Sequence, residues 1–256
     1  MAIPIRVKLG KKAKRIDPRT FKLSKYLKPH LPQPPAEVSY VVDVPSWPMD
    51  LNDQLGDCVV AAMAHMIQQW SFFSRGLSGM VVPTNAEVLT AYEAISGYVN
   101  GDPSTDTGCD MLTALNYWRN TGLAGHKIAG FVEVDAQNLL EVRQAIWMFG
   151  NLFTGLALPV FVQGAPDWTV PDGGIYGNAG QPGSWGGHCV PAMAESPETL
   201  TCVTWGERLK MSHNFLLDYA DEAFAVLSQD WINSIGLSPE GFNFDQLSAD
   251  LAEVTA

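Results

Sequence analysis

Two residues from opposite halves of the chain, Cys58 and His188, are of the types that act together in nucleophilic catalysis. Cys58 follows Gly56-Asp57 and opens a long apolar run, so its sulfur is expected at the N-terminus of a buried helix. Backbone N–H groups and the helix dipole favour a thiolate there, and can lower a thiol pKa from about 8.5 to as little as 3.5. The same N–H groups can bind an oxyanion. Cys58 is therefore the candidate nucleophile; the alternative is a small, inert, buried residue.

His188 is the candidate acid and base. A thiolate nucleophile needs an acid that protonates the leaving group, and an imidazole serves this purpose best. His188 begins a predicted strand after Gly186 and Gly187, whose missing side chains leave room for a substrate beside the ring. The pair predicts attack of the sulfur on an amide or peptide carbonyl, giving an acyl-enzyme that water resolves. A histidine that only binds a backbone carbonyl is the alternative.

The elements that must position these residues change in kind along the chain. Helices are predicted over 58–73, from the capping-box pair Thr84 and Glu87, over 110–120, and over 136–149. Strands are predicted at 152–158, 188–194, 200–205 and 223–227. Between them, residues 163–187 hold eight glycines and predict a mobile loop that ends at His188. This order of helices and then strands indicates an α+β protein.

Composition excludes several classes of protein. With 256 residues, of which 46% are hydrophobic and 17% charged, the chain can bury roughly three quarters of its unfolded surface, which excludes intrinsic disorder. The longest apolar run, 152–162, is shorter than the roughly 20 residues that cross a bilayer. The first 28 residues contain no apolar core of a secretory signal. Four cysteines without a CxxC pair are too sparse for a disulfide scaffold or a zinc knuckle, and Cys189 and Cys202, which can face each other on adjacent strands, are expected to be reduced.

Charge divides the chain. Residues 1–33 hold ten Lys or Arg and one acidic residue, so their net charge is +9. Residues 34–256 hold six basic and 26 acidic residues, so their net charge is −20. Such a basic arm can dock on its own acidic body, on a protein partner, or on nucleic acid. Nucleic acid is disfavoured because the arm lacks a repeated aromatic-basic pattern and the acidic body would repel phosphate. We expect deletion of residues 1–28 to spare the folding of the body.

The predicted domain organisation has three parts. Residues 1–33 form the arm, residues 34–234 form the main domain, and residues 235–256 form a C-terminal tail with a short docking helix. Within the main domain, a helical lobe spans about 50–130 and a sheet lobe about 131–232. A proline-rich stretch, 29–48, is expected to lie extended on the surface as the linker.

Five blocks in order resemble the papain-like cysteine peptidases. They are PAEVSY at 35–40, DQLGDC at 53–58, GCD at 108–110 with ALNY at 114–117, GGHCV at 186–190, and VTWG at 203–206. The blocks run from residue 35 to residue 206, and the resemblance covers residues 35–232. The whole chain also resembles uncharacterised papain-like proteins of tailed bacteriophages and their prophages. The resemblance implies a two-lobed papain-like α+β fold, with a helical N-terminal lobe, an antiparallel sheet in the C-terminal lobe, and a cleft between Cys58 and His188.

The same resemblance assigns roles to site residues. Cys58 would be the nucleophile, His188 the base and Gln54 the oxyanion donor, with no metal or organic cofactor. Gln54 lies two residues closer to the cysteine than is usual in the family, so Asn52 is a rival donor.

Val203 stands where the family has the asparagine that orients the histidine. Its side chain cannot form a hydrogen bond. By strand alternation Thr204 is expected to point away, so Thr201 or a water would have to substitute.

Two functions follow from these observations. The first is a cysteine hydrolase, a peptidase or amidase that acts on a peptide or protein substrate. The second is a catalytically weak or inactive structural protein of a virion or other viral assembly, which docks on a protein partner through residues 1–33. We expect the protein in the cytoplasm of a bacterial host or in the virion, and not at a membrane.

Overall fold

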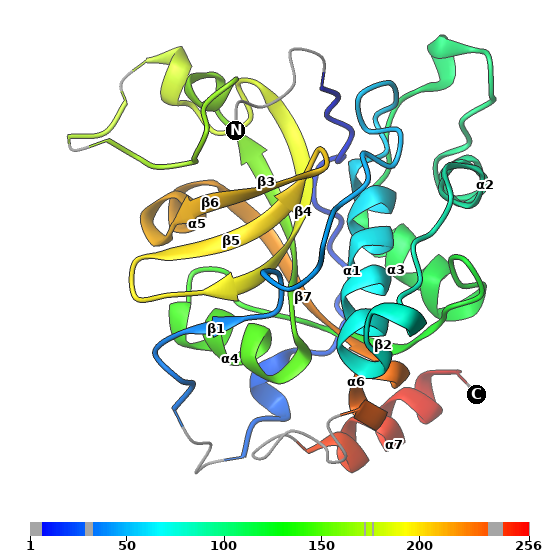
Figure 1. Ribbon diagram of the computed structural model, residues 1–256. Helices are drawn as coiled ribbons and strands as arrows, with labels where there is room; N and C mark the ends of the chain where they lie inside the picture. The colour runs from blue at the N-terminus through cyan, green and yellow to red at the C-terminus, as the bar shows by residue number, and fades with distance from the viewer. Residues whose placement is uncertain (1–6, 29–32, 172, 176, 235–242, 256) are drawn as a thin grey trace.

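A computed structural model describes residues 7–28, 33–171, 173–175, 177–234 and 243–255 (Figure 1). The helices are α1 Cys58–Arg75, α2 Asn85–Ser96, α3 Met111–Asn120, α4 Leu139–Phe149, α5 His213–Tyr219, α6 Gln229–Ser234 and α7 Phe244–Thr255. The strands are β1 Val38–Ser39, β2 Ile128–Glu133, β3 Leu152–Leu158, β4 Gly186–Glu195, β5 Thr199–Thr204, β6 Glu207–Ser212 and β7 Ala220–Ser228. Short 3-10 turns occur at Leu23–Lys25, Leu77–Gly79, Pro103–Thr105, Val160–Val162 and Asn178–Gly180.

Helix α1 is the central helix of the molecule. Every residue from Cys58 to Ser71 is buried, as its nearly continuous apolar sequence predicts. One side of α1 packs on the sheet at β4 and the other sides meet α2, α3 and α6. Its neighbour α2 begins at the predicted capping box, in which Thr84 and Glu87 satisfy each other's backbone N–H groups.

The sheet is antiparallel at every pairing among the described strands, and its order is β2-β7-β3-β4-β5-β6, with β1 added to β4. One core cluster fills the space between the helices and one face of this sheet. A second cluster lies on the other face, with α4, α5 and part of the N-terminal arm. The architecture is the predicted α+β arrangement, with a helical part followed by a sheet part.

The arm is part of the core rather than a separable segment. Leu23 and Tyr26 are 0% and 1% exposed, and both pack in the second cluster. Tyr26 also donates a hydrogen bond to Asp250 of α7, and Lys25 pairs with the same carboxylate. This burial contradicts the expectation that the body folds independently of residues 1–28. Residues 1–6 and 29–32, and the predicted boundary at 234/235, fall wholly or partly outside the described residues.

Five elements were not predicted from the sequence, namely β1, β2, β6, α5 and α6. Strands β2 and β6 form the two edges of the sheet, and β6 carries Glu207, Arg208 and Lys210 on exposed or half-buried positions. Charged edge strands look like loops because only one of their faces is buried. Helix α5 is a short segment that follows β6 directly, and its cap is Ser212.

The loop before β4 is held near its start. Trp168 is fully buried and its backbone bonds to Lys210 and Ser212 on both sides.

In the described part of the chain, no helix combines the length and the apolar character that a membrane span requires.

Candidate functional site

Cys58 is the first residue of α1 and lies at the junction of the two lobes. The carbonyl of Asp57 accepts the first hydrogen bonds of the helix, from Val60 and Ala61. The Cys58 side chain is 1% exposed. Its sulfur interacts with two backbone N–H groups, those of Cys189 in β4 and Gly10 in the arm. The predicted position of the thiol at a helix N-terminus is confirmed.

The protonation state of Cys58 differs from the prediction. Burial raises the pKa of the thiol to about 12, although the N–H groups of Cys189 and Gly10 act in the opposite direction. The helix terminus does stabilise the anion, but the arm seals the sulfur from water, and the loss of hydration outweighs that stabilisation. The prediction of a lowered thiol pKa is therefore wrong for the protein with its arm in place.

His188 lies near the start of β4, one residue before the Cys189 N–H that reaches the Cys58 sulfur. Its ring stacks on Trp205, with ring centroids 4.4 Å apart and planes 18° from parallel. The ring atom Nε2 is 2.7 Å from Oγ1 of Thr204, while Nδ1 is buried and has no hydrogen-bond partner among the described residues. Burial lowers the pKa of His188 to about 3, so the imidazole is neutral near pH 7.

Thr204 is the partner of the histidine, contrary to the expectation that it points away. Val203 packs in the first core cluster, on the α1 side of the sheet. The His188 ring contacts Trp205 of the second cluster, so it points to the opposite face. Strand alternation was therefore applied correctly to Val203 and Thr204, but the histidine was assigned to the wrong face.

A tight turn brings Trp205 over the ring. Strands β5 and β6 are joined at Thr204 and Glu207, and the two residues between them, Trp205 and Gly206, have φ of 49° and 76°. Two successive positive φ values are typical of a two-residue hairpin turn, and only glycine adopts them without strain. The turn moves Trp205 out of the strand alternation and onto His188.

The two candidate oxyanion donors lie in the loop before α1 and are engaged elsewhere. Gln54 is exposed, and its amide donates to Asp53 over 3.4 Å. Asn52 is buried, and its amide donates to the Leu55 carbonyl and to Asp57, each over 3.1 Å. Across the described residues no hydrogen bond joins either amide to Cys58. Backbone N–H groups at the start of α1 remain as candidate oxyanion donors.

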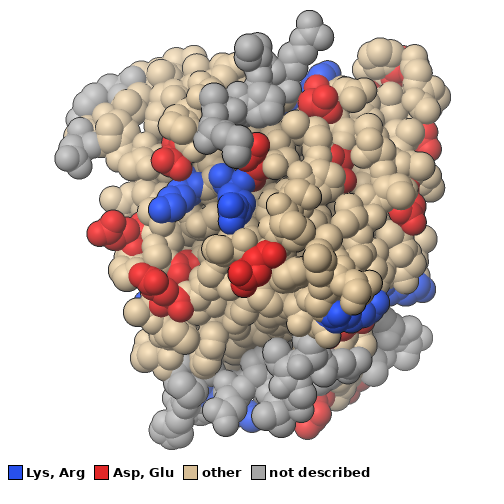
Figure 2. All heavy atoms as spheres, in the orientation of Figure 1, with Lys and Arg blue, Asp and Glu red and all other residues tan. Residues whose placement is uncertain are grey.

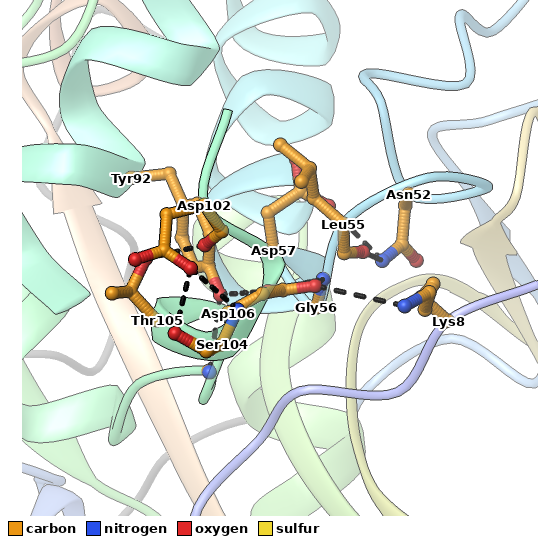
Figure 3. A network of polar contacts seen from close by, with 11 residues as sticks. Lys8, Asn52, Leu55, Gly56, Asp57, Tyr92, Asp102, Ser104, Thr105 and Asp106 are labelled. Carbon is orange, nitrogen blue, oxygen red and sulfur yellow. Dashed lines mark hydrogen bonds and ion pairs between the residues drawn. The ribbon is translucent and has the colours of Figure 1, made fainter. Parts of the chain in front are cut away.

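Asp106 fixes the loop that leads into Cys58, a role that sequence reasoning missed. Figure 3 shows its carboxylate between Gly56 and Tyr92. It accepts the Gly56 N–H over 3.0 Å and the Tyr92 hydroxyl over 2.6 Å, and Lys8 approaches it to 3.7 Å. The neighbouring residues Asp102 and Asp110 have local roles, because their side chains cap the turn at 103–105 and α3.

Residues 8–12 of the arm run through the junction between the lobes and cover Cys58 (Figure 1). The Lys8 N–H donates to Asn52, the Lys11 N–H to Gly187, and the Lys12 N–H to Cys109, while the Gly10 carbonyl accepts from the Cys109 N–H. A Cβ atom on Gly10 would collide with the Gly56 carbonyl, and a Cβ atom on Gly108 or Gly187 would collide with the arm backbone. The arm therefore docks on its own body, which is one of the three partners that its charge allowed.

On the face drawn in Figure 2, the described basic side chains lie singly or in small groups among acidic ones. A phosphate backbone on this face would meet carboxylates as well as lysines.

The remaining candidates have structural partners. His65 is buried in α1, and its Nε2 contacts Asp50 and the Pro48 carbonyl, at 3.1 and 2.9 Å, while its Nδ1 has no hydrogen-bond partner among the described residues. All four cysteines are free, and Cys202 lies opposite Ala192 rather than Cys189. The described residues contain no cluster of His, Cys, Asp or Glu side chains that fits a metal ion.

Solved structures with this arrangement are cysteine proteases. Xylellain, a cysteine protease from Xylella fastidiosa, is 14% identical, with a TM-score of 0.67 over 88% of this chain and 99% of that one. Bromelain from Ananas comosus, in complex with the E64 inhibitor, is 12% identical, with a TM-score of 0.54 over 76% of this chain and 100% of that one. Procathepsin L 3 of the Tenebrio molitor larval midgut is 11% identical, with a TM-score of 0.54 over 82% and 76%. Neither a family model nor a curated protein matches the sequence. At these identities the likeness establishes the papain-like fold and confirms that prediction.

Proposed function

We propose that the protein is a papain-like cysteine hydrolase, a peptidase or amidase, which residues 8–12 of its own arm hold in a latent state. The observation that carries the proposal is the packing of α1, which begins at Cys58, on β4, the strand that carries His188 near its start. The papain-like fold of the similar cysteine proteases supports the same reading.

The geometry at His188 supports its role as a proton carrier. If Nε2 donates its proton to Thr204, the neutral ring has an unprotonated Nδ1, and this atom is unpartnered among the described residues. Trp205 holds the plane of the ring by stacking. Together these contacts fix the tautomer that a general base needs.

The proposed reaction has two stages. In the structure the His188 ring packs on the face of the sheet opposite α1, so the reaction requires the ring to turn towards Cys58 once the arm has left. Nδ1 of His188 then takes the Cys58 proton, and the sulfur forms a bond to the amide carbonyl carbon, whose oxygen faces the N–H groups at the start of α1. The C–N bond then breaks, and the imidazolium gives its proton to the leaving amine. In the second stage His188 takes a proton from water, the hydroxide adds to the thioester carbon, and the C–S bond breaks. The sulfur leaves with the proton, and the products are a carboxylic acid and an amine.

With the arm docked as in the structure, this reaction is blocked. Gly10 lies over the sulfur, and no room for a substrate carbonyl is left between Gly10 and Gly56. Attack therefore requires residues 8–12 to leave the junction. Their departure would also admit water and so reverse the burial that raises the pKa of Cys58.

The test compares the full chain with Lys11→Ala, which weakens arm docking, and with Cys58→Ala in each background. Fluorogenic peptide amides serve as substrates. We expect slow hydrolysis by the full chain, at least a tenfold faster rate for Lys11→Ala, and no hydrolysis by either Cys58→Ala protein. Hydrolysis that survives Cys58→Ala, or its absence from Lys11→Ala protein that folds normally, would contradict the proposal. The alternative function, a virion-assembly protein that docks through residues 1–33, stays a prediction, as does the resemblance to phage proteins. Residues 8–12 of this segment are docked on the chain's own body in the structure.

A further inference from the structure

Lys11 is the one basic residue of the described arm that is buried at its charged end. Its side chain is 1% exposed, and Nζ lies 2.9 Å from Oε1 of Glu222 and 2.8 Å from Oδ2 of Asp221. The Glu222 side chain is fully buried. Burial alone would lower the pKa of Lys11, but the charges of Glu222 and Asp221 outweigh it and raise that pKa. The ammonium therefore stays charged inside the protein.

The other basic residues of the arm make contacts of a different kind. The pairs Lys8–Asp106, Lys14–Glu133 and Arg15–Asp110 all leave the basic side chain between 32% and 52% exposed. Exposed pairs of this type contribute little to affinity or selectivity, because water and salt screen them. In the pair of Lys11 with Glu222 both charged groups are removed from water, and such a pair discriminates strongly between partners.

A space in the sheet admits the Lys11 side chain. A Cβ atom on Gly155 of β3 would collide with Cε of Lys11 and lie 2.7 Å from Cγ of Glu222. Glycine at this position leaves a slot with Gly155 on its wall and the two carboxylates at its end. The second oxygen of Glu222, Oε2, is buried and has no hydrogen-bond partner among the described residues. The slot thus offers a second acceptor to a basic group with more than one donor.

The slot opens beside the candidate catalytic residues. The N–H of Lys11 donates to the carbonyl of Gly187, the residue before His188, over 3.1 Å. The preceding residue, Gly10, contacts the Cys58 sulfur through its N–H. A peptide that replaces the arm in this junction would therefore place one of its side chains at the position of Lys11.

We infer that Gly155, Asp221 and Glu222 form a specificity slot of the substrate cleft, which selects peptides with a lysine or arginine side chain at this position. Lys11 occupies the slot while the arm is docked. The inference rests on the proposed function in one respect, namely that the peptide in the slot is a substrate. The selectivity of the slot can be measured by binding, without hydrolysis.

The binding test uses the full chain with Lys11→Ala, which empties the slot. Two peptides are compared by calorimetry: acetyl-Leu-Gly-Lys-Lys-Ala-amide, which repeats residues 9–13, and the same peptide with norleucine in place of its first lysine. We expect the lysine peptide to bind about tenfold more tightly or better, because norleucine leaves the carboxylates buried and unpaired. Adding Glu222→Gln should reduce the ratio of the two peptides' dissociation constants to below about threefold. Asp218→Asn, which removes one exposed negative charge, should leave this ratio unchanged. The Glu222→Gln change preserves the shape of the side chain, and a thermal melt checks that each variant folds.

Equal or tighter binding of the norleucine peptide would overturn the inference, as would a preference that survives Glu222→Gln. Hydrolysis of both peptides at equal rates by Lys11→Ala would also overturn it while leaving the proposed function intact. Selective binding without hydrolysis of either peptide would support the slot and count against the hydrolase.

Discussion

At the scale of single residues, the site differs from the pattern of its sequence in the group that orients the imidazole. Val203 occupies the expected asparagine position in sequence, while Thr204 occupies the functional position in space. A hydroxyl can accept the Nε2 proton as an amide oxygen does, since both are neutral acceptors. The hydrogen bond to the imidazole is therefore formed by a shorter side chain, because the hairpin turn at Trp205 brings β5 close to the ring.

The role of Thr204 can be tested with two substitutions in the Lys11→Ala background. Thr204→Val removes the acceptor at nearly constant volume and leaves Nε2 buried without a partner, which costs about 1–3 kcal/mol of stability. We expect hydrolysis to fall roughly 10²-fold or more, since loss of the orienting group in a catalytic triad costs up to about 10⁴. Thr204→Ser should restore most of the rate. A positioning role also predicts a changed pH–rate profile, whereas a purely structural role predicts an unchanged profile and a lower melting temperature only.

The neutral, buried imidazole of His188 makes stability depend on pH. Burial lowers the pKa of His188 to about 3 in the folded protein, whereas an unfolded histidine titrates near 6.5. The neutral form is therefore favoured by folding, so its contribution is complete above about pH 6.5 and declines as the pH falls towards 3, by about 1.4 kcal/mol per pH unit. Between pH 6.5 and 5 we expect the wild type to lose about 2 kcal/mol more than His188→Asn does, by urea denaturation. Equal losses for the two proteins would show that the imidazole is not buried in solution.

At the scale of elements, the site is assembled where the start of α1, the start of β4 and the arm meet. Each of these approaches needs glycine on at least one side, at Gly56, Gly108 and Gly187. The glycines allow backbone to lie directly against backbone, which is how the arm reaches the sulfur. The latent state is thus held by main-chain contacts as well as by the Lys11 charge.

Substitution of Gly187 tests whether these contacts keep Cys58 covered. The Cβ atom of Gly187→Ala would collide with the Lys11 carbonyl, and the φ of Gly187 is not in the left-handed region, so the strand itself accepts alanine. We expect iodoacetamide to modify Cys58 at least tenfold faster in Gly187→Ala than in the wild type, because the thiol gains water and its pKa falls from about 12. Cys202, buried in β5 with its thiol donating to the Leu209 carbonyl, is the internal control. Modification of both cysteines at one rate would indicate global unfolding instead of arm release.

The elements with continuous burial were predictable, and those that depend on distant contacts were not. The apolar run of α1 and the capping box of α2 are local signals, and both helices form where they were expected. The sequence also placed Cys58 and His188 on the correct elements. The docking of Lys11 on Glu222 was not predictable, because a basic arm and an acidic body fit many partners. Nor was the thiol pKa, which depends on which segment covers the sulfur.

At the scale of the whole molecule, the two ends of the chain hold each other and the sheet. The arm contributes Leu23 and Tyr26 to the second core cluster, and α7 contributes Leu247 and the carboxylate of Asp250. Residues 8–12 close the junction between the lobes, while residues 23–26 anchor the same arm on the far face of the sheet. If residues 8–12 leave the junction as proposed, the anchor at residues 23–26 would keep the rest of the arm in place.

Two substitutions within the arm test this division. Leu23→Ala removes a fully buried side chain from the second core cluster, and such a change costs about 2–5 kcal/mol. Ile16→Ala removes a side chain of similar size that is 81% exposed, so its effect should stay within about 0.5 kcal/mol. Urea denaturation of the full chain measures both values, and for Leu23→Ala we also expect Cys58 to stay protected from iodoacetamide under native conditions, since the contacts of residues 8–12 are untouched. A negligible loss for Leu23→Ala would mean that the arm is a detachable segment after all. Rapid modification of Cys58 in that variant would mean instead that the anchor and the inhibitory segment open as one unit.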